Sequence, residues 1–134
     1  MPIKINQWNL NGFYSRLEYL QSLIDKEQPG IICLQETNFK RLSFDKLKNY
    51  KAFIKNRSTD HAGGGVAIYI KNTFHSQEVA ITSNLEVVAT RVMLPTNLHI
   101  CNIYLPNSQH LDEVELTRIF SQLSKTIHHH GRLQ

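Results

Sequence analysis

The side chains best suited to chemistry in this 134-residue chain lie in two short polar segments that each end an apolar run. Residues 8–12 read WNLNG and residues 31–37 read IICLQET. Asn9 and Asn11 carry amides that both donate and accept hydrogen bonds. Of eleven Asp and Glu residues, Glu36 alone ends an apolar strand, where a carboxylate is costly to desolvate unless it holds a metal or a donor. Glu36 is therefore a candidate metal ligand.

The hydrophobic pattern predicts the elements that must position these side chains. Strands are expected at 3–8, 30–34, 50–55, 66–70, 86–94 and 98–104, the last two forming a hairpin. A capping box at Ser15 and Glu18 opens a helix that ends at Pro29-Gly30, and Asp112 with Glu115 starts a final helix. The order is β-α-β, a β-meander and a helix, so we expect one α/β unit with one sheet face uncovered.

Positive charge is concentrated in one stretch of a chain whose net charge is +4. Residues 40–57 contain Asp45 as their single acid and seven basic residues, namely Lys40, Arg41, Lys46, Lys48, Lys51, Lys55 and Arg57. Two interpretations stay open. The stretch is either a solvated loop and edge strand or a patch that faces phosphate groups.

Composition excludes several protein classes. No run approaches the length of an apolar membrane span, and the N-terminal residues lack a signal peptide's apolar stretch, so we expect an intracellular protein. Cys33 and Cys101 lie in apolar strands without zinc-finger spacing, which predicts two buried, reduced thiols.

Four motifs in order resemble the endonuclease/exonuclease/phosphatase superfamily. They are residues 8–12 followed by Arg16, residues 34–37, residues 63–68 and residues 103–107. The resemblance is greatest to the apurinic-type endonuclease domain of non-LTR (LINE-like, jockey-type) retrotransposon polyproteins. It implies the N-terminal part of the four-layer α/β/β/α sandwich of the deoxyribonuclease I-like fold, with the second sheet largely missing.

The resemblance also implies roles for individual residues in a Mg²⁺-dependent cleavage of DNA. Glu36 would hold the metal, Asn9 would bind the scissile phosphate or a metal-bound water, and Tyr104 would steady the phosphate or a catalytic carboxylate. The residues expected to bind nucleic acid are Asn11, Arg16, Asn107, Lys46, Lys48 and Lys51. From the residues alone, Tyr104 also fits an amphipathic strand end. A helix-surface position is favoured over a DNA contact for Arg16, and a flexible loop over a phosphate cradle for residues 63–65 (GGG).

The family's later Gly-Asp-x-Asn and Asp-His motifs are not found, and Arg132 stands where a metal-site carboxylate is expected. We therefore expect a partial domain at 1–127 and an out-of-frame tail at 128–134. One coding of Ile-Ile-Ile-Met-Gly-Asp-Phe-Asn, read two bases later, gives the HHHGRLQ of 128–134.

The expected function is an endonuclease-like domain serving target-primed reverse transcription, inactive as this fragment and nuclear if it works in a retrotransposon. The alternatives are a catalytically dead nucleic-acid-binding remnant or a fragment of another phosphoesterase branch of the superfamily.

Overall fold

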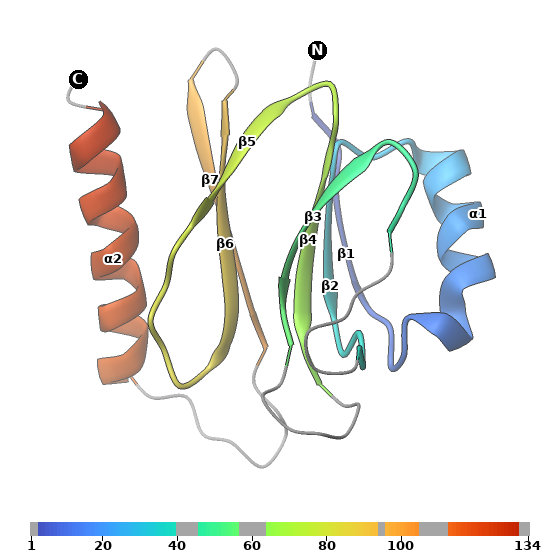
Figure 1. Ribbon diagram of the computed structural model, residues 1–134, viewed down its shortest axis with the longest axis horizontal. Coiled ribbons are helices and arrows are strands. Elements are labelled where there is room, and N and C mark those ends of the chain that lie inside the picture. Colours follow the sequence, from blue (N-terminus) through green and yellow to red (C-terminus); the bar gives the residue numbers. More distant parts are fainter. Residues whose placement is uncertain (1–2, 40–45, 57–63, 94–95, 105–112, 132–134) are drawn as a thin grey trace.

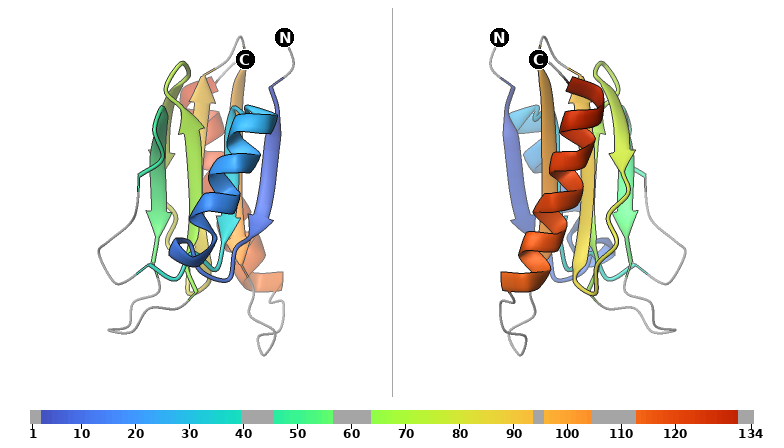
Figure 2. Two further views of the ribbon diagram at one scale, coloured as in Figure 1. Left: turned by 90° about the vertical axis from the view of Figure 1, so that its right-hand side faces the viewer. Right: turned by 90° about the vertical axis from the view of Figure 1, so that its left-hand side faces the viewer.

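Two β-sheets lie face to face, and one helix covers the outer face of each (Figure 1). The computed structural model describes residues 3–39, 46–56, 64–93, 96–104 and 113–123, and the backbone of residues 124–131. Side views place α1 across the outside of the first sheet and α2 across the outside of the second (Figure 2). The four-layer α/β/β/α order expected from the sequence is confirmed.

The first sheet has four strands in the order β1-β2-β4-β3. Their bounds are β1 Ile5–Asn9, β2 Ile31–Gln35, β3 Tyr50–Lys55 and β4 Val66–Lys71. β1 and β2 are parallel and the other pairs are antiparallel. The parallel pair is joined by a 3-10 turn, η1 (Tyr14–Arg16), and by α1 (Leu17–Glu27), as a parallel connection requires a crossover element.

The second sheet is antiparallel, in the order β5-β6-β7, and is followed by α2. The bounds are β5 His75–Val79, β6 Glu86–Met93, β7 Asn97–Tyr104 and α2 Glu113–Gly131. We expected this sheet to be largely missing, and the described residues supply three of its strands. The polar β5 gives no alternating signal, and the β6–β7 hairpin packs onto the first sheet instead of extending it.

The apolar core between the sheets covers most of the sheet face that we expected to be exposed. Ile31, Ile68 and Ile70 of the first sheet pack against Val88 and Val92 of the second, and all five are buried. Burial of this face removes apolar surface from water, which is the main favourable contribution to folding. The three described strands of the second sheet thus cover β2, β3 and β4, whereas the same face of β1 stays exposed at Ile5.

The helices begin differently from the pattern's prediction. Ser15 does not cap α1; it lies in η1 and its Oγ donates to the carbonyl of Gly12 at 3.2 Å. Glu115 does lie in the first turn of α2, but its buried carboxylate accepts hydrogen bonds from the Ser83 hydroxyl and, at 3.2 Å, from the Asn84 N–H. Asp112 lies outside the described residues. Within the described part of the chain, neither helix combines the length and apolar character needed to cross a bilayer.

Candidate active site

Glu36 and Tyr104 meet where β2 and β7 end. These strand ends lie at the lower edge of the sandwich in Figure 1. Glu36 directly follows β2, and Tyr104 is the last residue of β7. The Tyr104 hydroxyl donates a hydrogen bond of 2.7 Å to Oε1 of Glu36, and both side chains are half-buried. The carboxylate thus has a fixed neutral donor on one oxygen while it stays accessible at the rim.

A left-handed backbone conformation turns the Glu36 carboxylate toward Tyr104. Along β2, Leu34 packs on the α1 side, whereas Cys33 and Gln35 face the second sheet. Regular alternation would send Glu36 back to the α1 side, but its φ of 53° breaks the alternation. Such a conformation costs a residue with a Cβ about 1–2 kcal/mol. The fold therefore holds an unfavourable turn at the point where the carboxylate is placed.

Two glycine-containing segments hold this turn through their backbone. Gly12 N–H donates to the Glu36 carbonyl at 2.8 Å, and Asn38 N–H donates to the Gly64 carbonyl at 2.8 Å. Gly65 has φ 92°, and a Cβ there would lie 2.8 Å from the hydroxyl of Thr37. Our interpretation of the glycine run as a flexible loop is wrong for Gly64 and Gly65, because both are buried with positive φ and Gly65 also has no space for a Cβ.

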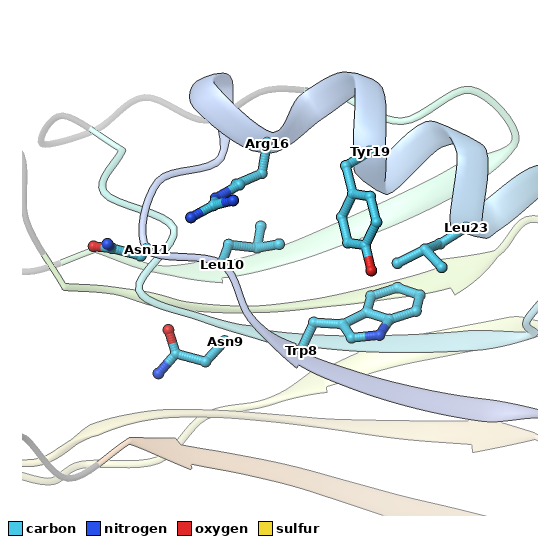
Figure 3. A pocket seen from close by; sticks show the side chains of 7 residues that line it. All are labelled: Trp8, Asn9, Leu10, Asn11, Arg16, Tyr19 and Leu23. Carbon is cyan, nitrogen blue, oxygen red and sulfur yellow. The ribbon is translucent and has the colours of Figure 1, made fainter.

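Asn9 lies at the same edge of the sandwich. It ends β1 opposite Gln35, which precedes Glu36, and it is exposed. Figure 3 shows its side chain directed away from α1, on the side of the second sheet. The structure thus brings together the three residues expected to be catalytic, Asn9, Glu36 and Tyr104.

A pocket of about 300 Å³ opens between β1 and α1 beside this edge (Figure 3). Its lining residues are Trp8, Asn9, Leu10, Asn11, Arg16, Tyr19 and Leu23. Asn11 and Arg16 are exposed, and Asn11, with φ 51°, lies in the turn that follows β1. Two of the residues expected to bind nucleic acid therefore share a pocket with Asn9.

The lysines expected to bind nucleic acid lie at the other end of the first sheet. Lys51 pairs with Ile70, which in turn pairs with Ile31 at the start of β2, and Lys46 and Lys48 precede this end of β3. The Lys51 ammonium donates to the Ser76 carbonyl at 3.4 Å and lies 5.3 Å from the centre of the Phe53 ring. The structure does not bring these three lysines to Glu36, and Asn107 lies outside the described residues.

Three further polar residues, which the sequence pattern did not single out, surround the Glu36–Tyr104 pair. Glu86 lies opposite Tyr104 in the β6–β7 register, and its carboxylate accepts the Gly65 N–H. Gln35 and Asn102 are buried and bonded to each other across the sheets, with 2.6 Å between Gln35 Nε2 and Asn102 Oδ1. Gln35 and Asn102 stand out as polar residues at strand positions that face the interior. These positions can be recognised only when the pairing of the strands is known.

The residues at this edge suit a hard divalent cation. Mg²⁺ binds through one or two carboxylates and keeps further positions for water and substrate phosphate, and the half-exposed Glu36 carboxylate meets that minimum. The described residues contain no group of three or more His, Cys, Asp or Glu arranged around one metal.

Comparisons with known proteins agree with this geometry. The model of the Endonuclease/Exonuclease/phosphatase family matches residues 7–127. The chain is 32% identical over 74 residues to the "Probable RNA-directed DNA polymerase from transposon X-element" of Drosophila melanogaster, covering 54% of the chain and 8% of that protein. It is 30% identical over 112 residues to the DNA-(apurinic or apyrimidinic site) endonuclease of Dictyostelium discoideum, covering 79% of the chain and 31% of that protein.

The fold also agrees with a solved structure. The endonuclease domain of TRAS1, a telomere-specific non-LTR retrotransposon, superposes with a TM-score of 0.69 over 98% of this chain and 56% of that domain. The identity is 12%, so this likeness shows the fold alone. The chain spans less than a third of each sequence relative and about half of the solved domain.

Proposed function

The chain belongs to the endonuclease/exonuclease/phosphatase family, and on that premise we propose that it supplies part of a metal-dependent site for cleaving DNA phosphodiester bonds. The observation that carries the proposal is the Tyr104–Glu36 hydrogen bond at the rim of the sandwich, beside Asn9. The matches to a transposon polymerase and to a retrotransposon endonuclease fold favour the endonuclease domain of a non-LTR retrotransposon as its context.

Each of the three side chains has a distinct task in this proposal. Glu36 would hold Mg²⁺ through its carboxylate, and the Tyr104 hydroxyl keeps that carboxylate in one orientation. The bound ion would act as a Lewis acid on a phosphoryl oxygen. The exposed amide of Asn9 would donate to the scissile phosphate.

DNA would lie across the end of the sandwich that carries Glu36. Arg16 and Asn11 at the mouth of the neighbouring pocket supply a cation and an amide suited to backbone phosphates. Asn107, three positions after Tyr104, is proposed as a further backbone contact. A retrotransposon endonuclease acts on chromosomal DNA, so this proposal places its action in the nucleus.

By itself the 134-residue chain is expected to be inactive. Catalytic residues that act as a unit lose most of their activity when one of them is missing. The described residues do not assemble three metal-binding groups. We expect no nicking of supercoiled plasmid with Mg²⁺. Nicking that disappears in Glu36→Gln would show that a complete site exists and would contradict this expectation.

Metal binding tests the proposal without requiring activity. Paramagnetic Mn²⁺ added to the ¹⁵N-labelled chain should broaden the amide signals of Asn9, Glu36 and Tyr104 first, and Glu36→Gln should abolish that broadening. Glu18→Gln, on the exposed face of α1, is the matched control and should leave it unchanged. Broadening that is centred elsewhere, or that survives in Glu36→Gln, would refute the assignment of the metal ligand.

A further inference from the structure

A buried amide cluster, Gln35 with Asn102, lies directly behind the Glu36–Tyr104 pair. The exposed fractions of the two residues are 5% and 4%. Gln35 immediately precedes Glu36 on β2, and Asn102 lies two positions before Tyr104 on the same face of β7. Each member of the cluster is thus attached to the backbone segment that carries one member of the pair.

Asn102 uses its whole side-chain amide to bind the first sheet. Its Nδ2 donates to the carbonyls of Leu34 and Ala67, each at 3.0 Å, and its Oδ1 accepts from Gln35 Nε2 at 2.6 Å. An amide has two N–H donors and one carbonyl oxygen, so this arrangement satisfies every group. Leu34 and Ala67 are themselves paired between β2 and β4. One side chain of β7 therefore binds two strands of the opposite sheet.

Directional contacts matter here because most of the interface is apolar, apart from hydrogen bonds such as those from Gly65 N–H to Glu86 and from Lys51 to the Ser76 carbonyl. The hydrophobic effect that drives burial of the apolar side chains is itself non-directional. The hydrogen bond from Tyr104 to Glu36 is lost when its donor and acceptor atoms move apart by about 1 Å more, because atoms farther apart than about 3.5 Å no longer form a hydrogen bond. A fully bonded amide in the interface permits a single relative position of β7 and β2.

We propose that Asn102 is a positioning residue: it holds β7 against β2 in the register at which the Tyr104 hydroxyl reaches Glu36. Its value to catalysis rests on the proposed function, but the positioning itself does not.

Fluorine NMR of the full chain labelled with 3-fluorotyrosine tests this proposal. Tyr104→Phe assigns the Tyr104 signal, and Glu36→Ala gives the chemical shift of a Tyr104 hydroxyl that is not bonded to Glu36. Asn102→Leu keeps the number and branching of the side-chain heavy atoms and removes the three hydrogen bonds. We expect this substitution to change the chemical shift of Tyr104 by at least half of the change that Glu36→Ala produces. Gln35→Met should move the signal in the same direction by less.

Thr90→Val is the matched control, because it also removes a buried hydrogen bond of the second sheet, the one from Thr90 Oγ1 to the Gln77 carbonyl at 2.8 Å. It should leave the Tyr104 signal in place. An unmoved signal in folded Asn102→Leu, or an equal movement in Thr90→Val, overturns the proposal.

If Asn102→Leu does not fold, hydrogen exchange of the wild-type chain tests the proposal instead. The side-chain NH₂ of Asn102 is expected to exchange with solvent only through global unfolding, and rapid exchange would overturn the proposal. Absence of Mn²⁺ broadening at Glu36, together with a moved Tyr104 signal in Asn102→Leu, would refute the proposed function and leave the positioning role standing.

Discussion

The Tyr104 hydroxyl donates to the Glu36 carboxylate at 2.7 Å and thereby joins the last residue of β7 to the residue that follows β2. The two residues belong to different sheets and are 68 positions apart in the chain. Their contact therefore depends on the packing of the whole sandwich, and a change in that packing should be detected at this pair first.

Replacement of Glu36 should reveal the energy stored in its left-handed backbone. Glu36→Gly and Glu36→Ala both remove the carboxylate, but Gly adopts a φ of 53° without a Cβ penalty. We expect the Gly variant to be more stable than the Ala variant by about 1 kcal/mol in urea unfolding. Ser22 in α1 is the control, where Gly should be less stable than Ala by about 1 kcal/mol. The same order of stabilities at both sites would disprove the strain at Glu36.

The end of the molecule that binds DNA can be identified from salt dependence. If DNA lies across the Glu36 end, Arg16→Ser should lower the slope of log K against log salt concentration by about 1. Replacing Lys46 and Lys48 with Ser, at the opposite end of the sheet, should leave the slope unchanged. The reverse result would favour a nucleic-acid-binding remnant that uses the basic stretch independently of Glu36.

Glu115 should be a large contributor to the attachment of α2. It is 7% exposed and accepts hydrogen bonds from Ser83 Oγ and from Asn84 N–H, while the Arg118 guanidinium lies 3.8 Å away. We expect Glu115→Ala to lower the free energy of unfolding by about 2–3 kcal/mol, because two donors lose a charged acceptor. Glu113→Ala, exposed in the same turn, is the control and should change it by less than about 0.5 kcal/mol. Equal effects at the two positions would contradict the role of Glu115.

Alkaline pH should destabilise the fold through its two thiols. Burial raises the pKa of Cys33 and of Cys101 from 9.0 to about 11, and the proximity of Cys101 adds to the effect at Cys33. Between these values the unfolded chain releases protons that the folded chain retains. Stability is thus unaffected below pH 9 and is lost as the pH rises toward 11, by on the order of 1 kcal/mol per thiol at pH 10.

The Cys33→Ala/Cys101→Ala double variant separates this effect from the titration of other groups. Its free energy of unfolding should fall less between pH 9 and 11 than that of the wild type. Parallel curves for the two proteins would rule out the thiols as the cause.

Local pattern in the sequence determined the elements with strong apolar signals. Residues 31–34 of β2 and the first five residues of β4 are buried, as their unbroken apolar runs indicate. The apolar spacing of α1 placed its contact face, where Leu20 is buried and Leu17 and Ile24 pack beside it. Glu36 stood out because an acid at the end of an apolar strand needs a partner, and it has one in Tyr104.

The tertiary structure alone decided how these elements meet. β5 is polar, so no hydrophobic periodicity predicts it. It forms because it pairs with the edge of β6. The turn of Glu36 toward the second sheet, the Gln35–Asn102 bond and the distance of Lys51 from Glu36 all depend on strand pairing and sheet packing. Periodicity assigns a side chain to a face of its own strand. Which residue this side chain contacts in the opposite layer depends on strand registers between residues far apart in the chain.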